Sequence, residues 1–383
     1  MHSFDFQLPT RIVFGAGKLS ELGAVAASLG CQRALVVSDP GIVAVGHTPR
    51  GIASLEEAGL NVLLFDGVGE NPTTAHVDAG LSVAQEYRPD LIIGLGGGSS
   101  MDCAKGINFL YSCGGRMQDY VGKGKSTGPM LPMIAVPTTA GTGSETQSYA
   151  LIADAETHVK MACGDKRAAF RAAILDPELT LTQPPRVTAL TGIDALSHAL
   201  ETYVTKRRNA ISLIFSRWAW QRLSANFGRV LTEPQNLEAR GEMQLGAALA
   251  GVAIENSMLG ATHALANPLT ANYGIVHGEA ISLMLPHVIR HNGRTVGAWY
   301  AELVASSAKV DGFATANDAV ESLAAFVSSI SQQAGLPGTL GDRDVPLSAL
   351  PELAAAASEQ WTGTFNPVSM TAGDFQGLYE AAM

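Results

Sequence analysis

The first half of the chain alternates short apolar runs with amphipathic segments. Apolar runs predict four buried strands, at residues 34–38, 61–65, 90–94 and 132–136. Helical periodicity between the strands predicts helices at residues 52–60 and 74–87. Strands that alternate with helices are typical of crossover units, which build a parallel sheet with helices on both faces. We therefore predict an α/β domain over residues 1–184.

The pattern changes near residues 182–186, beyond which β-like runs almost disappear. Helical periodicity then dominates and predicts helices at residues 194–204, 210–227, 237–254, 276–290 and 316–334. We predict an all-helical second domain over residues 185–383.

The composition narrows the class of protein. The chain has 383 residues, of which 46% are hydrophobic and 16% charged, so it has ample apolar material for a folded core. Its net charge is -10 and no cluster of Lys and Arg of useful length occurs, which argues against a nucleic-acid partner. We find neither a signal-peptide layout nor an apolar stretch near the ~20 residues that span a bilayer. We expect a cytoplasmic protein with no membrane partner.

Two loops that follow predicted strands are suited to an anion. The first, Gly94–Lys105, reads GLGGGSSMDCAK, and glycines at a strand-to-helix turn let backbone N–H groups approach a pyrophosphate. It lacks the third glycine of the Rossmann fingerprint. The second, Pro137–Glu145, reads PTTAGTGSE and combines glycines with hydroxyl side chains. A bare glycine cluster is also an ordinary tight turn, but two such loops in one sheet favour a phosphate site.

Asp39 follows the strand predicted at residues 34–38. A carboxylate in this place accepts hydrogen bonds from an adenosine ribose in many dinucleotide-binding domains. An Asp before a proline is equally a common turn residue, so the residue type leaves both roles open.

Histidines concentrate in the second half, where five of the nine lie between residues 198 and 291. Asp194 and His198 are four residues apart in a predicted helix, which places them on one face within reach of a common ion. His263 and His277 would complete a set of three imidazoles and one carboxylate. Such ligands suit Fe²⁺, Zn²⁺, Mn²⁺ or Co²⁺. The alternative is that each histidine is a packed or capping residue, which is the role we assign to His287 and His291.

These segments together resemble the iron-containing (group III) alcohol dehydrogenase family, over essentially the whole chain. The resemblance rests on residues 96–105 and 137–145, on Asp194 and His198 with their spacing, on His263, and on the pair His277-Gly278. It implies an N-terminal Rossmann-like parallel-sheet nucleotide-binding domain and a C-terminal helical metal-binding domain, a dehydroquinate-synthase-like arrangement. It also implies an active site in the cleft between the domains.

The resemblance further implies roles for individual residues. The metal ligands would be Asp194, His198, His263 and His277, holding Fe²⁺ or alternatively Zn²⁺. The NAD(P) contacts would come from Asp39, Asn71, Gly97, Gly98, Ser99, Asp102, Thr138, Thr139, Thr142 and Lys160. A carboxylate at position 39 favours NAD over NADP, because it repels a 2′-phosphate.

One position departs from the family pattern. Many members have a histidine four residues after the third ligand, and here that position is Asn267, before Pro268. Asparagine does not carry a proton at neutral pH, although it hydrogen-bonds to substrate or water. The sequence therefore leaves two questions undecided: whether Asn267 contacts the substrate, and which path the proton takes.

The resemblance implies hydride transfer between nicotinamide C4 and a small primary alcohol or its aldehyde, with the metal as Lewis acid. It also implies a homodimer or a higher homo-oligomer. The alternatives are a carbonyl reductase of the same fold, similar to maleylacetate reductase or glycerol dehydrogenase, and a dinucleotide sensor without catalysis.

Overall fold

The computed structural model describes residues 4–307 and 315–383, and it divides the chain into two compact units. The sheet unit comprises residues 7–139 and 143–183. The helical unit comprises residues 184–383 together with residues 140–142 and the first six residues, as far as these are described. Each unit has its own buried apolar core.

Six parallel strands form the main sheet of the sheet unit, in the order β1-β9-β6-β4-β2-β3. The strands are β1 (Arg11–Phe14), β2 (Arg33–Val37), β3 (Asn61–Phe65), β4 (Leu91–Gly96), β6 (Met133–Pro137) and β9 (Ala172–Leu175). Every residue of β4 and β6 is buried, as expected for central strands covered on both faces. The four predicted strands are confirmed as β2, β3, β4 and β6.

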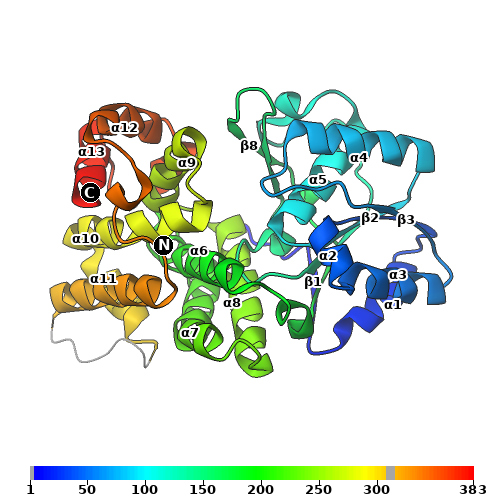
Figure 1. Ribbon diagram of the computed structural model, residues 1–383, viewed down its shortest axis with the longest axis horizontal. Helices are drawn as coiled ribbons and strands as arrows, with labels where there is room; N and C mark the ends of the chain where they lie inside the picture. Colours follow the sequence, from blue (N-terminus) through cyan, green and yellow to red (C-terminus); the bar gives the residue numbers. More distant parts are fainter. Residues whose placement is uncertain (1–3, 308–314) are drawn as a thin grey trace. The chain divides into compact units, whose positions relative to one another are not determined.

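Helices cover both faces of this sheet. They are α1 (Leu22–Ser28), α2 (Pro40–Ala44), α3 (His47–Glu57), α4 (Thr74–Tyr87) and α5 (Gly98–Cys113). In Figure 1, α4 and α5 lie on one side of the sheet and α1 and α3 on the other. The helix expected at residues 52–60 begins five residues earlier, at His47. Pro49 belongs to its first turn, where the missing N–H needs no partner.

A second, three-stranded sheet in the order β5-β8-β7 lies in the same unit and was not predicted. Its strands are β5 (Gly122–Lys123), β7 (Tyr149–Ala153) and β8 (Lys160–Gly164), and β7 and β8 pair antiparallel. Burial alternates along β7, the period of two expected for a strand with one buried face. The buried positions of β7 are Ala150 and Ile152, and its other positions are also apolar or small, so the sequence shows no clear alternation of apolar and polar residues. The parallel-sheet prediction was therefore incomplete for residues 122–164.

The described part of the helical unit contains helices and no strands. The helices are α6 (Pro185–Val204), α7 (Ala210–Thr232), α8 (Leu237–Asn256), α9 (Ala261–Tyr273), α10 (His277–Val304), α11 (Ala316–Gln333), α12 (Leu350–Ser358) and α13 (Ala372–Ala381). The five helices predicted here are confirmed in α6, α7, α8, α10 and α11, although α6 begins nine residues before the expected start. Three helices were not predicted, α9, α12 and α13.

No helix in residues 4–307 or 315–383 combines the length and the apolar character needed to cross a membrane.

Candidate functional site: a buried cluster of three histidines and an aspartate

Asp194 and His198 lie one turn apart on α6. The Asp194 Oδ1 atom is 3.3 Å from His198 Nε2, and both residues are buried. The spacing of four residues brings the two side chains onto one helix face, as the geometry of an α-helix requires.

His263 on α9 and His277 at the first position of α10 meet the same carboxylate. The Nε2 atom of each lies 3.6 Å from Asp194 Oδ1, and the Nε2 atoms of His198 and His263 are 3.2 Å apart. Gly278 allows this approach, because a Cβ atom there would come within 2.5 Å of the Leu190 carbonyl oxygen on α6. The residue after His277 must therefore be glycine for α10 to begin so close to α6.

The residues of the cluster fit a divalent metal ion. Asp194 Oδ1 is buried and has no hydrogen-bond partner among the described residues, although three imidazole nitrogens face it. Buried polar atoms are almost always satisfied, and a cation between these atoms would satisfy all of them. Ligand atoms of Asp194, His263 and His277 all lie within 4.8 Å of one another, and His198 adds a fourth donor. Three nitrogens and one carboxylate oxygen suit Fe²⁺ or Zn²⁺.

The surroundings shift the pKa values of the candidate ligands in different directions. Burial alone would raise the pKa of Asp194, but His198, His263 and His277 outweigh it and lower that pKa. Burial lowers the pKa of His198, which favours the neutral imidazole that binds metals. Burial would also lower the pKa of His263, but Glu201 and Asp194 raise it to about 9. A metal ion would bind the neutral imidazole, so it would compete with the additional proton that these two carboxylates favour on His263.

Glu201 belongs to the site and was not among the predicted residues. Its Oε2 atom accepts a hydrogen bond from His263 Nδ1 at 2.6 Å, and its Oε1 atom accepts one from the Thr262 backbone N–H at 2.7 Å. A carboxylate on the far nitrogen of a metal-binding histidine fixes the tautomer and the ring orientation. The signal was present in the sequence, because Asp194, His198 and Glu201 follow the i, i+4, i+7 spacing of one helix face.

Asn267 lies one turn after His263 on α9 and contacts Gln360. Its Nδ2 atom donates a hydrogen bond to Gln360 Oε1 at 3.0 Å, and both side chains are half-buried. Gln360 directly precedes the short 3-10 helix η8 (Trp361–Phe365). An amide pair therefore lies one helical turn after His263.

In the sheet unit, the predicted nucleotide contacts gather at the carboxyl ends of adjacent strands. After β2 the chain forms β3 on one side of β2, whereas β4 and then β6 pair on the other side. Ligands of open α/β sheets bind where the strand order reverses in this way. Asp39 follows β2, Gly97, Gly98 and Ser99 follow β4, and Thr138 and Thr139 follow β6.

Asp39 has a structural role of its own. Its Oδ1 atom accepts a hydrogen bond from the Ile42 backbone N–H at 3.0 Å and so caps α2. The Ser100 hydroxyl donates to its Oδ2 atom at 3.4 Å. Asp39 thus caps α2 through Oδ1 and lies beside the glycine loop through Oδ2. The cap does not prevent Oδ2 from also accepting a hydrogen bond from a ribose.

The glycine loop opens directly into a helix N-terminus. Gly96 has a φ of 154°, and a Cβ atom there would come within 2.4 Å of the Ser100 hydroxyl oxygen. Gly97 is the N-cap of α5, so the first backbone N–H groups of α5 are available to a phosphate. The Asn71 backbone N–H donates to the Ser99 hydroxyl at 3.2 Å, and the buried Thr138 hydroxyl has no partner among the described residues.

The remaining predicted nucleotide contacts are Asp102, Lys160 and Thr142. Asp102 is buried and accepts hydrogen bonds from the Ser144 hydroxyl at 2.5 Å and the Leu151 N–H at 3.2 Å, so it ties α5 to the second loop. Burial raises the pKa of Asp102, and Lys105 and, more weakly, Lys160 on β8 partly offset that rise. Thr142 is grouped with the helical unit, whereas the other predicted nucleotide contacts belong to the sheet unit.

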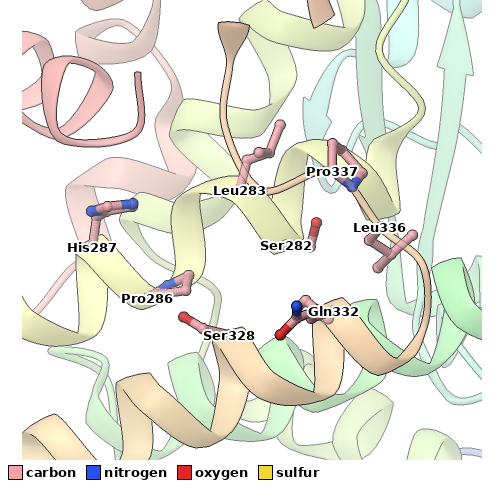
Figure 2. Close-up of a pocket in the computed structure, with 10 residues that line it drawn as sticks. Ser282, Leu283, Pro286, His287, Ser328, Gln332, Leu336 and Pro337 are labelled. Atoms are coloured by element: carbon pink, nitrogen blue, oxygen red, sulfur yellow. The ribbon is translucent and has the colours of Figure 1, made fainter. Parts of the chain in front are cut away.

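A cavity of about 370 Å³ lies elsewhere in the helical unit, between α10 and α11. Figure 2 shows Ser328 and Gln332 of α11 directed toward Ser282 and Pro286 of α10. His287 also lines this cavity, but none of the four candidate ligands does. The cavity is therefore separate from the histidine cluster.

Comparison with known proteins agrees with this geometry. The family model of the iron-containing alcohol dehydrogenases matches residues 9–177, and the model of the C-terminal region of the same family matches residues 188–383. The 1,3-propanediol dehydrogenase of Klebsiella pneumoniae is 35% identical over 369 residues, covering 95% of each chain. The NAD-dependent methanol dehydrogenase of Bacillus methanolicus is 32% identical over 382 residues, covering 99% of this chain and 100% of the relative.

A solved structure of a 1,3-propanediol oxidoreductase superposes with a TM-score of 0.96 at 32% identity, and the match covers 100% of both chains. The chain belongs to the iron-containing alcohol dehydrogenase family, as its sequence motifs predicted. It is accordingly an oxidoreductase that acts on CH–OH groups.

Proposed function

We propose that this protein interconverts a small primary alcohol and its aldehyde with NAD as hydride carrier and Fe²⁺ in the histidine cluster, Zn²⁺ being the alternative metal. The observation that carries the proposal is the buried Asp194 Oδ1 atom, which faces three imidazole nitrogens and has no hydrogen-bond partner in the described chain. Such a donor set is costly to bury without a cation.

The residues of this chain have distinct tasks in the proposed reaction. Asp194, His198, His263 and His277 would hold the metal, whose chemistry is that of a Lewis acid for the alcohol or carbonyl oxygen. Glu201 holds His263 in one tautomer and keeps its Nε2 atom directed at Asp194. Asn267 contributes hydrogen bonds but no titrating group.

The residues after β2, β4 and β6 would bind the dinucleotide. The N-terminus of α5 would face the pyrophosphate, and Asp39 would accept hydrogen bonds from the ribose. NAD is favoured over NADP because the Asp39 carboxylate would repel a 2′-phosphate, and a relative of 32% identity is named as NAD-dependent. We place Asn71, Ser99, Thr138, Thr139, Thr142 and Lys160 among the contacts, with Asp102 supporting them from α5.

The test is a small-aldehyde screen with purified protein. Propanal and NADH should be turned over by protein that has been stripped with a chelator and reloaded with Fe²⁺ or Zn²⁺, and NADPH should serve less well. Turnover that is indifferent to chelation would favour the metal-free reductase alternative. Binding of NADH without turnover of any aldehyde would favour the sensor.

The cytoplasmic location and the homo-oligomer stay predictions from the sequence. A molar mass measured by light scattering tests the second of them.

A further inference from the structure

The side-chain amides of Asn267 and Gln360 form an uncharged pair next to the candidate metal ligands. Asn267 and His263 share a face of α9, and side chains four residues apart on a helix have Cβ atoms ~5–6 Å from each other. The Nε2 atom of His263 is directed at Asp194. The amide pair therefore lies about one helical turn from the point where the four candidate ligands converge.

The pair leaves one carbonyl oxygen and one NH₂ group without a protein partner. Asn267 Nδ2 donates to Gln360 Oε1 at 3.0 Å, and neither the Asn267 Oδ1 atom nor the Gln360 Nε2 atom has a partner among the described residues. If both amides were turned over, the direction of their hydrogen bond would reverse. One carbonyl oxygen and one NH₂ group would still be free. The donor–acceptor character of the pair thus does not depend on the assignment of its atoms.

A hydroxyl group matches such a pair better than other polar groups. It donates one hydrogen bond and accepts others, so it satisfies the free carbonyl and the free NH₂ together. A carbonyl or ether oxygen would use the donor alone. A carboxylate or an ammonium group would find no opposite charge in two amides, and would lose hydration on entering a half-buried site.

We propose that Asn267 and Gln360 bind a second hydroxyl group of the substrate, so that the preferred substrates are diols and the corresponding hydroxyaldehydes. This inference rests on the proposed function, because the first oxygen of the substrate must lie at the metal. Gln360 has two roles: its NH₂ group would donate to that hydroxyl, and its Oε1 atom accepts from Asn267 and so fixes the orientation of the Asn267 amide. The two residues determine specificity and leave hydride transfer to the cofactor.

The test compares 1,3-propanediol with 1-propanol, two alcohols of equal chain length, using metal-loaded enzyme and NAD. We expect the wild type to have the higher kcat/KM for the diol. Gln360→Met keeps the length of the side chain but removes both polar atoms, and should lower the diol-to-propanol ratio of kcat/KM about 10-fold, the value of one hydrogen bond. The loss should appear mainly as a higher KM for the diol, since the second hydroxyl takes no part in the chemistry.

Two further variants separate positioning from a general structural effect. Gln360→Glu keeps an acceptor for Asn267 but replaces the NH₂ group by a charged carboxylate oxygen, which still accepts from a hydroxyl but no longer donates to it. Its ratio should therefore fall between those of wild type and Gln360→Met. Gln376→Met makes the same exchange on α13, where Gln376 bonds to Glu380, and should keep the wild-type ratio. Metal content and melting temperature, measured on every variant, identify any protein that has not folded.

The inference is overturned if both alcohols react but the ratio is the same in wild type and Gln360→Met. It is also overturned if the wild type does not prefer the diol. No oxidation of either alcohol by the loaded wild type would instead contradict the proposed function, and the inference with it.

Discussion

Glu201 accepts a hydrogen bond from His263 Nδ1 at 2.6 Å, and this contact joins the carboxylate of α6 to an imidazole of α9. Burial would raise the pKa of Glu201, but His263 outweighs it and lowers that pKa, so the acceptor is a carboxylate. The His263 proton is thereby held on Nδ1, which leaves Nε2 free to face Asp194. Glu201 therefore orients the candidate ligand His263, although Glu201 itself was not among the residues predicted from the sequence.

Glu201→Gln should therefore weaken metal binding. The amide is a poorer acceptor for an imidazole N–H, and loss of such a partner typically costs 10–100-fold in metal affinity. Equilibrium dialysis against Fe²⁺ or Zn²⁺ measures the change. Glu302→Gln, at a solvent-exposed ion pair with Arg217 in the same unit, is the matched control. Equal metal affinities in the two variants would show that Glu201 does not support the ligand.

His198→Ala should remove one of the four donors and abolish turnover, while the sheet unit, which has its own core, still folds. Metal analysis, NADH turnover and NADH binding on the same sample measure the three effects separately. His287→Ala is the control, because His287 lines the separate cavity beside α10. Near-normal turnover of His198→Ala with unchanged metal content would refute the site.

Asp39→Gly should shift cofactor preference from NAD toward NADP, because it removes a ribose acceptor and a negative charge. It also removes the cap of α2, which typically costs a few tenths of a kcal/mol for glycine. Asp39→Asn separates the two effects, since asparagine keeps the cap and loses only the charge. The ratio of kcat/KM for the two cofactors should change in both variants. A ratio that stays at the wild-type value in both would exclude position 39 from cofactor selection.

Asn267→His should change the pH profile of kcat. The wild type has no titrating group at this position, whereas the variant should gain a limb near the ordinary histidine pKa of about 6.5. That result would show that a side chain at position 267 can reach the proton route, which in the wild type would then run through water. Superimposable profiles with altered Michaelis constants would instead assign Asn267 to substrate fit alone, in line with its contact to Gln360.

Glu145, in the second glycine-containing loop, should make stability depend on pH. Burial raises its pKa to about 7, from 4.5 in the unfolded chain. Between these values the folded state binds more protons, so this contribution is present below pH 4.5 and is lost as the pH rises through 7. Glu145→Gln should therefore raise the melting temperature relative to wild type at pH 8 but not at pH 4. Each pKa unit corresponds to ~1.4 kcal/mol. An equal offset at both pH values would contradict the assignment.

The parts of the fold that sequence predicts well are those with a strong, regular pattern. Strands β4 and β6 are buried at every position and so appear as uninterrupted apolar runs. The edge strand β1 and the short strand β5 lack that pattern, because few of their residues are buried. A proline in the interior does not by itself decide the outcome, because α9 with Pro268 was not predicted whereas α10 with Pro286 was.

The site shows a similar division. Asp194 and His198 can be paired from spacing alone, because both lie on one helix. His263 and His277 approach them only through packing of α9 and α10 on α6, and the resemblance to a family was needed to name them. The contact between Asn267 and Gln360 joins residues 93 positions apart, so no local pattern could predict it.

The central claim is that the histidine cluster holds one metal ion on which alcohol–aldehyde turnover depends, and a metal titration tests it most directly. Chelator-treated protein receives Fe²⁺ or Zn²⁺ in steps under anaerobic conditions, and bound metal and NADH-dependent reduction of propanal are measured at each step. We predict that activity rises in proportion to bound metal and levels off at one ion per chain, and that His198→Ala follows neither course. Full activity in protein that retains almost no metal would contradict the account.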